Sequence, residues 1–241
     1  MAKKIPKKIK TFYQVSLPPE KETADFYPEY SIVVKTVDAV NSFRSLYKVG
    51  RRGLSGPSTH AQQDLYRAML VFACAGLDVL VKQLIKTKLP QLMSSDKKVK
   101  EKFKDFVKRG MKKDEKELLN AIALALVDDS PKEFLAQEYI ESLTGDSLQS
   151  VEELRRVSEA SGLDRDIIFS RDKMNVLKDA FIVRNQIIHE MDINIIPQKS
   201  KKTGYRTRRQ RKSPEMEGHT KNILDLAQEI FTAFKAKFSS S

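Results

Sequence analysis

The chain has little of what cross-links or tightly turns a protein. It contains a single cysteine, Cys74, which excludes an intrachain disulfide and is typical of a reduced, intracellular setting. Glycine and proline number only 9 each among 241 residues. No Asn-Gly or Asp-Gly dipeptide occurs, so the strongest hairpin signal is missing. These shortages argue against a β-sandwich with many tight turns.

The chain also lacks a segment suited to secretion or to crossing a membrane. The N-terminal MAKKIPKKIK is basic, but the TFYQVSLPPE behind it is too short and too broken by proline for a signal peptide. The longest apolar run, residues 68–81, is interrupted by Asp78 and falls short of a membrane span. We therefore expect a soluble, cytoplasmic protein that has no membrane partner.

Positive charge is what the chain has in excess. There are 44 Lys and Arg residues against 32 Asp and Glu residues, which gives a formal net charge of +12. Such a balance favours contact with phosphates or with an anionic surface, although it does not define a fold. Hydrophobic residues make up 40% of the chain, which suits a globular domain with a real core.

Apolar residues recur at helical spacing along almost the whole chain. Helices are predicted at about residues 30–50, 60–88, within 97–117, and at 117–129, 130–143, 147–162, 172–190 and 218–238. Thr59 and Gln62 resemble a capping box at the start of the second and most apolar helix, and Pro90 is expected to close it. The pattern predicts an all-α protein with a single helical-bundle domain.

Two basic segments accompany the predicted bundle, which covers residues 29–241. One is an N-terminal arm, residues 1–28, and the other is a loop at 199–213 before the last helix. The loop includes Tyr205, which offers one ring for base stacking. Its basic residues are predicted to gather RNA over the site: Lys199, Lys201, Lys202, Arg206, Arg208, Arg209, Arg211 and Lys212.

The stretch FIVRNQIIHEMDIN, residues 181–194, holds the candidate site. Arg184 and His189 are five residues apart, about 140° around a helix, so they do not share a face. Asn185 and His189, at i and i+4, do share one. Two copies of this helix meeting across a dimer would bring two arginines and two histidines into one cleft. The side chains expected to face the core are Leu177, Phe181 and Ile188.

A plainer interpretation of this stretch is also open. An Arg and a His near a helix C-terminus are favoured by the helix dipole alone. His60, in the first turn of a predicted helix, and His219, just before the last predicted helix, are interpreted as surface residues. No HExxH or CxxC pattern occurs, and His189-Glu190-x-Asp192 is a weak metal signal, so no metal site is predicted.

Arg184-Asn185 followed by His189, late in an all-helical domain, resembles the Rx4–6H motif of the HEPN superfamily. LYRAMLVFACAGLDVLVKQLI, residues 65–85, is similar to the long early helix of its RiboL-PSP-HEPN branch, in which an acidic residue interrupts an apolar segment. The likeness covers roughly residues 30–240. It implies a metal-independent endoribonuclease that uses no cofactor and acts as a homodimer with a site built from both chains.

The residue types suit that implied chemistry. RNA supplies its own 2′-OH as nucleophile, so a histidine is needed to move protons and an arginine to stabilise charge on the phosphorus. We assign His189 as general acid/base, Arg184 as the phosphate contact, and Asn185 to holding the substrate or orienting the imidazole. A 2′,3′-cyclic phosphate and a 5′-hydroxyl are the expected products.

Asp78, which interrupts the apolar run, has two interpretations. In one, it pairs with Arg184 or His189 from the facing helix and supports the site, because an unpaired buried carboxylate is costly. In the other, it emerges on the wet side of its helix and pairs with Lys82.

Three classes of function follow from these observations. The first is an RNA-cleaving enzyme, such as a toxin or antiviral effector held in check by an antitoxin or another regulatory partner. The second is an HEPN-like helical dimer that binds nucleic acid or a nucleotide without cutting it. The third is a helical adaptor for an acidic protein or membrane surface, which ranks last because no strongly amphipathic basic helix stands out.

Overall fold

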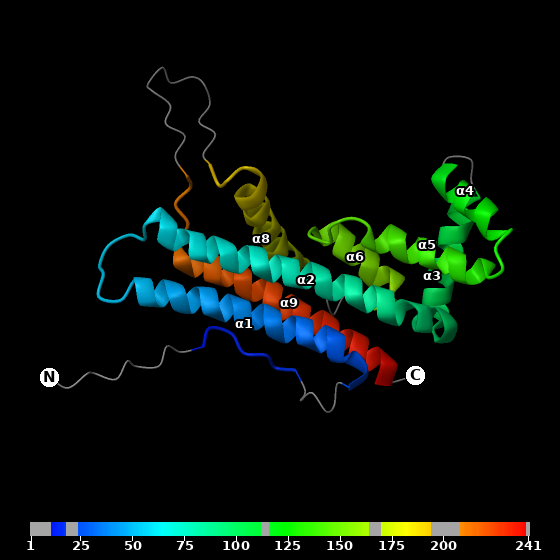
Figure 1. Ribbon diagram of the computed structural model, residues 1–241, viewed down its shortest axis with the longest axis horizontal. Helices are drawn as coiled ribbons and strands as arrows, with labels where there is room; N and C mark the ends of the chain where they lie inside the picture. Colours follow the sequence, from blue (N-terminus) through cyan, green and yellow to red (C-terminus); the bar gives the residue numbers. More distant parts are fainter. Residues whose placement is uncertain (1–10, 18–23, 112–115, 164–169, 194–207, 240–241) are drawn as a thin grey trace, which may run out of the picture.

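The computed structural model describes residues 11–17, 24–111, 116–163, 170–193 and 208–239. Within these ranges the chain forms eight helices, so the predicted all-α fold is confirmed (Figure 1). They are α1 (Tyr27–Gly50), α2 (His60–Ser95), α3 (Lys97–Gly110), α4 (Lys116–Ala125), α5 (Pro131–Thr144), α6 (Val151–Ala160), α8 (Arg171–His189) and α9 (Ser213–Ser239).

Three long helices, α1, α2 and α9, lie side by side and form the body of the molecule (Figure 1). Helix α2 is the central one and contacts both of the others. It begins as the sequence predicts, because the Thr59 hydroxyl accepts from the Gln62 amide while the Gln62 side chain accepts from the Thr59 amide. The fully buried side chains of α2 include Tyr66, Met69, Leu70, Leu77, Leu80, Leu84, Ile85, Leu89 and Leu92.

A close approach between α1 and α2 depends on Gly76. A Cβ atom at Gly76 would lie 2.2 Å from Thr36 Oγ1. Thr36 is itself held, because its hydroxyl donates a 2.7 Å hydrogen bond to the Ile32 carbonyl. Only a residue without a side chain fits between these helices.

Pro90 does not close α2, contrary to the sequence prediction. The helix runs through Pro90 to Ser95. Pro90 lies on the exposed side, whereas Leu89, Leu92 and Met93 are buried on the other side. Burial of these three side chains outweighs the hydrogen bond that proline cannot donate.

Part of the predicted N-terminal arm lies against the bundle. Residues 11–17 run along α1 and α9, and only 7% of Tyr13 is exposed. The Tyr13 hydroxyl donates a 2.6 Å hydrogen bond to Asp225 of α9, and its amide donates to Asn41 of α1. Residues 1–10, which hold the basic KKIPKKIK, lie outside the described ranges.

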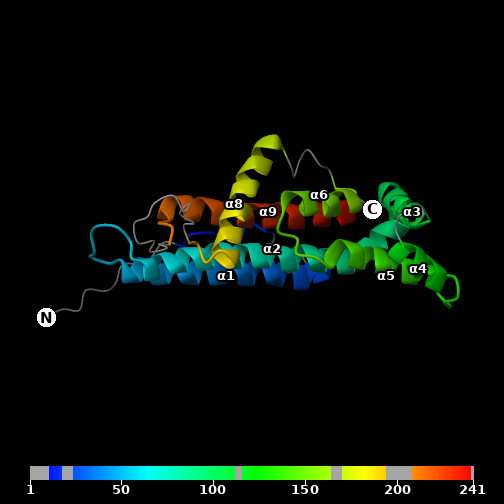
Figure 2. The same ribbon diagram turned by 90° about the horizontal axis from the view of Figure 1, so that it is seen from above.

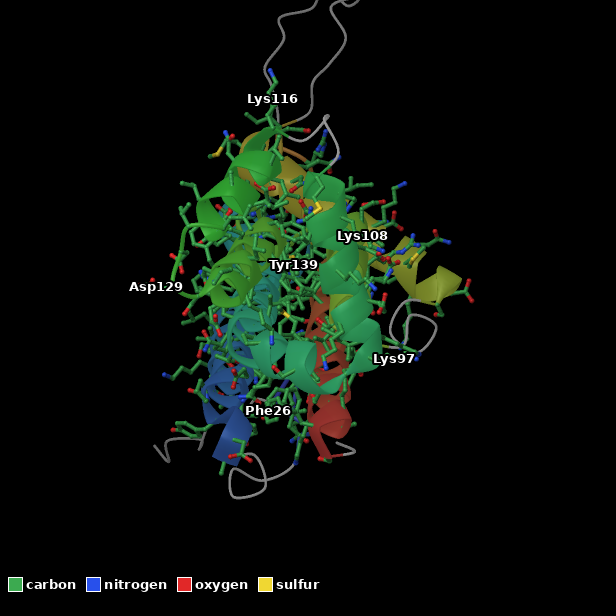
Figure 3. The ribbon with its side chains drawn as sticks, turned by 90° about the vertical axis from the view of Figure 1, so that its right-hand side faces the viewer. Phe26, Lys97, Lys108, Lys116, Asp129 and Tyr139 are labelled. Carbon is green, nitrogen blue, oxygen red and sulfur yellow. The ribbon has the colours of Figure 1, made fainter. Side chains whose placement is uncertain are left out.

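The shorter helices α3, α4 and α5 gather at one end of the molecule (Figure 3). Tyr139 of α5 is buried there against the rings of Phe103 and Phe106 of α3. Lys97 and Lys108 lie along α3, and both are exposed (Figure 3). Helix α3 is therefore the short, basic, exposed helix that the sequence predicts within 97–117.

Helix α2 is long and apolar enough to cross a membrane by length and composition. Half of its most apolar window is buried inside the bundle, however. A core helix of a soluble domain has the same character, and the arrangement of α1 and α9 along α2 fits that description.

Candidate functional site

Helix α8 carries the candidate residues and crosses α9 to reach α2 (Figure 2). Its buried side is formed by Leu177, Ala180, Phe181 and Val183. Ile188 was expected in the core, but 38% of it is exposed. At 100° per residue Ile188 lies only about 20° from Phe181, so its exposure follows from its place next to the end of α8 and not from its angle. Arg184 lies about 40° from Ala180, on the same side of the helix.

Arg184 is half-buried and faces α2. Burial raises the pKa of the Cys74 thiol on α2 to about 12, and the charge of Arg184 acts on it in the opposite direction. Arg184 Nη1 donates a 2.9 Å hydrogen bond to Asn185 Oδ1, which holds the two side chains together. Its Nε is buried and has no hydrogen-bond partner among the described residues.

His189 is the last residue of α8 and is exposed, as is Asn185 one turn earlier. In the described part of the chain, no hydrogen bond or ion pair joins Arg184 to His189. The two side chains leave the helix about 140° apart, as their spacing requires. One copy of the chain thus presents an accessible imidazole and, separately, a guanidinium without a carboxylate partner among the residues described.

Asp78 does not support this site within one chain. Its Oδ1 accepts a 2.6 Å hydrogen bond from the Leu148 amide, and its Oδ2 lies 3.2 Å from Lys82 Nζ. The pairing with Lys82 agrees with the alternative interpretation, but only 16% of the Asp78 side chain is exposed, so it does not lie on the wet side of α2. Asp78 instead fastens the segment before α6 to α2, because Leu148 itself is completely buried.

A network of arginines and carboxylates surrounds the end of α8, and sequence reasoning missed it. Its centre is Asp192, whose side chain is 0% exposed. Asp192 Oδ2 accepts a 2.8 Å bond from Arg67 Nε of α2, and Oδ1 lies 2.6 Å from Arg211 Nη2, just before α9. Burial alone would raise the pKa of the Asp192 carboxyl, but hydrogen bonds from Arg211 and Arg67 outweigh it and hold that pKa below its ordinary value.

The arginines predicted to bind RNA belong largely to this network. Arg208 lies 2.6 Å from Asp64, and Arg209 lies 3.2 Å from Glu190. With Arg211 on Asp192, each described arginine of the basic loop has a carboxylate partner. Their contact with RNA stays a prediction. Lys212 is exposed. The predicted residues that lie outside the described ranges are Lys199, Lys201, Lys202 and Arg206, together with Tyr205.

His60 is the first residue of α2, whereas His219 lies within α9, about two turns from its start, contrary to the expectation that it precedes the last helix. His60 is exposed, and its Nε2 lies 3.3 Å from Gln210 Nε2. His219 lies 3.9 Å from Glu215, one turn away on α9. Among the described residues, no group of three or more His, Cys, Asp or Glu side chains is placed to hold a metal ion.

Comparison with known proteins places the chain in a family. The RiboL-PSP-HEPN family model matches residues 36–235, so the chain belongs to the RiboL-PSP-HEPN family. The matched range spans the bundle from α1 to α9 and includes the helix with Arg184 and His189. No curated protein and no solved structure matches the chain. Membership in this family suggests a ribonuclease or nucleotide-binding function.

Proposed function

We propose that this protein is a metal-independent endoribonuclease whose site forms where two copies of α8 meet. The observation that carries the proposal is the state of Arg184: its Nε is buried without a hydrogen-bond partner, and no carboxylate among the described residues neutralises its charge. A buried donor left unpaired is costly, and a phosphate oxygen would satisfy it. His189 is exposed on the same helix and is free to reach a substrate.

The proposed reaction needs only groups of this chain and of RNA. The 2′-oxygen attacks the adjacent phosphorus while an imidazole removes its proton, and the bond from phosphorus to the 5′-oxygen breaks as a second imidazole protonates that oxygen. Two copies of His189 supply both roles. Arg184 stabilises the charge that develops on the non-bridging oxygens, and Asn185 holds the guanidinium in place through its 2.9 Å bond.

A dimer is proposed because one helix cannot assemble these groups. Arg184 and His189 diverge by about 140°, so a single chain does not aim both at one phosphate. Apolar side chains are also exposed beside the motif: Ile182 on α8 is 45% exposed, and Met191, in the turn just after α8, is 63% exposed. Apolar side chains gathered next to exposed polar ones favour an interface with another surface.

Basic residues near the end of α8 are proposed to hold the RNA. Ile193, just after α8, and Arg208 form an antiparallel bridge, so the described basic residues that begin at Arg208 lie near the end of α8. Among the lysines of the basic loop that are predicted to bind RNA, Lys212 lies within the described residues, and it is exposed. Regulation by an antitoxin, as in a toxin or antiviral effector, remains part of the proposal; slow growth on expression that His189→Ala relieves would support it.

The experiment that tests the function is cleavage of labelled total tRNA and mRNA in EDTA. Wild type is compared with Arg184→Ala and His189→Ala, and the fragment ends are analysed. We expect metal-free cutting that leaves 2′,3′-cyclic phosphate ends and falls by at least about 100-fold in both variants. Binding without cutting, equal in all three proteins, would favour the alternative of a non-catalytic dimer that holds nucleic acid or a nucleotide.

A further inference from the structure

The turn after His189 has an unusual backbone. Met191 has φ 52° and Asp192 has φ 55°, so two consecutive residues other than glycine adopt the left-handed conformation. Each such residue costs roughly 1–2 kcal/mol relative to an ordinary conformation. The turn therefore persists only because surrounding contacts hold it, and those contacts lie directly beside the proposed catalytic histidine.

Arg211 holds this turn at both ends. Its Nη2 donates a 2.7 Å hydrogen bond to Gln186 Oε1 and a 2.6 Å hydrogen bond to Asp192 Oδ1. The backbone closes the same span, because the Asp192 amide donates a 2.8 Å bond to the Gln186 carbonyl. His189 lies midway between these two residues, so the guanidinium of Arg211 fixes the segment that carries it.

Arg67 ties the turn to the core helix α2. Only 3% of its side chain is exposed. It donates to Asp192 through Nε at 2.8 Å, to the Arg209 carbonyl through Nη2 at 2.7 Å, and to Asp64 through Nη1 at 3.0 Å. Because α2 is the most buried helix of the bundle, its arginine provides a rigid reference for the end of α8.

We propose that Arg67, Asp192 and Arg211 form a clamp that positions His189, and that Arg211 contributes to cleavage through this clamp and not by contacting RNA. The inference rests on the proposed function for the role of His189. The Arg211 side chain is 10% exposed, and its charge lies against Asp192, which leaves little of it for a phosphate. Lys212, the next residue, is exposed, so we expect it to contact RNA and not to position His189.

The test compares Arg211→Gln with Lys212→Gln. Single-turnover cleavage at saturating enzyme separates the chemical step from RNA binding, and binding is measured over a range of salt concentrations. For Arg211→Gln we expect the chemical step to slow by about 10- to 100-fold, with RNA affinity and its salt dependence unchanged. For Lys212→Gln we expect weaker binding with a salt slope reduced by about one, and an unchanged chemical step. If Arg211→Gln instead weakens RNA binding and its salt dependence and leaves the chemical step unchanged, the clamp is wrong.

A second measurement does not depend on activity. Hydrogen exchange of the peptide covering residues 187–192 is compared in wild type, Arg211→Gln, Asp192→Asn and Lys212→Gln. We expect exchange at least about 10-fold faster in the two clamp variants and wild-type exchange in Lys212→Gln, with other helices unchanged. Wild-type exchange in both clamp variants would refute the clamp even if the protein cleaves RNA. Faster exchange in the clamp variants of a protein whose wild type cleaves nothing would refute the ribonuclease alone.

Discussion

At the scale of single residues, the same amino-acid type behaves differently according to its partner. Arg184 has a buried Nε without a partner among the described residues, whereas Arg67 uses Nε, Nη1 and Nη2 as donors to two carboxylates and a carbonyl. The first is suited to an incoming phosphate, and the second is a structural tie. Net charge alone does not separate these two roles, since both residues count equally toward +12.

Asp78 allows the supporting role to be tested directly. Asp78→Asn removes the ion pair with Lys82 and weakens the bond from the Leu148 amide, so we expect a loss of about 1 kcal/mol in the free energy of unfolding. RNA cleavage is expected to stay within about two-fold of wild type, because Asp78 contacts neither Arg184 nor His189 in the chain as described. Chemical denaturation measures the expected loss of stability, and the cleavage assay measures the expected retention of activity. A large loss of cleavage with intact stability would restore the supporting role.

Asp192 predicts a loss of stability in acid. Its pKa is lowered in the folded protein, so its contribution is present above the unfolded value of about 3.9 and is lost as pH falls through the lower folded value. At pH 7 we expect Asp192→Asn to cost about 3 kcal/mol, since Arg67 and Arg211 then lose the buried carboxylate that they share. Below about pH 4 the difference between variant and wild type should shrink. Urea denaturation at pH 7, 5 and 3 measures the difference in the free energy of unfolding between Asp192→Asn and wild type. A difference that does not change with pH would contradict the lowered pKa of Asp192.

At the scale of helices, packing decides where elements begin, end and touch. Helix α2 passes Pro90 because Leu89, Leu92 and Met93 are buried on its inner side. Helix α8 turns Arg184 toward α2 and leaves Ile188 exposed. In both cases the face that contacts a neighbouring helix overrides the preference of a single residue.

The close approach of α1 and α2 predicts that replacing Gly76 by alanine destabilises the protein, although Gly→Ala in a helix usually stabilises. In an open helix position, Gly→Ala stabilises by about 1 kcal/mol. A Cβ atom at Gly218 of α9 would meet no other atom within 4 Å, so Gly218→Ala should follow that rule. Gly76→Ala should instead destabilise by about 1–2 kcal/mol, because its Cβ would lie 2.2 Å from Thr36 Oγ1. Thermal unfolding of both variants checks the prediction.

The rescue experiment identifies the contact responsible. Thr36→Ala removes the two closest atoms, so the double variant with Gly76→Ala should recover part of the lost stability. If Gly76→Ala and Gly218→Ala change stability equally, the close approach of the two helices is not what requires glycine.

At the scale of the whole molecule, the proposed site needs two chains. This predicts that an inactive partner lowers the activity of an active one. After subunit exchange with a nine-fold excess of His189→Ala, cleavage per wild-type chain should fall about ten-fold, because few wild-type chains then find a wild-type partner. Mixing with the same excess of Asp78→Asn, which lies outside the proposed site and is itself expected to cleave, should leave cleavage per total chain near its original value. Unchanged cleavage per wild-type chain in the His189→Ala mixture would mean that each chain cuts alone.

Local patterns in the sequence were enough for most of the architecture. The sequence predicted an all-α bundle from apolar residues at helical spacing, from the Thr59 capping box and from the scarcity of glycine and proline. Helical spacing and capping depend only on residues within one or two turns, so they can be recognised without the tertiary structure. The Arg184-Asn185 and His189 pattern likewise lies within one helix, so its family resemblance and its 140° divergence could be read from spacing alone. Whether those residues catalyse stays a prediction.

Only the tertiary structure decided which charges are paired. Arg67 and Asp192 are 125 residues apart in sequence, and no local pattern links them. The same holds for Arg208 with Asp64 and for Asp78 with the Leu148 amide. Ion pairs of this kind form because folding brings distant helices together and excludes water from between them, which makes an unpaired charge costly there. The sequence therefore determined the helices and the candidate motif, and the packing of α2, α8 and α9 determined which basic residues are left to meet a substrate.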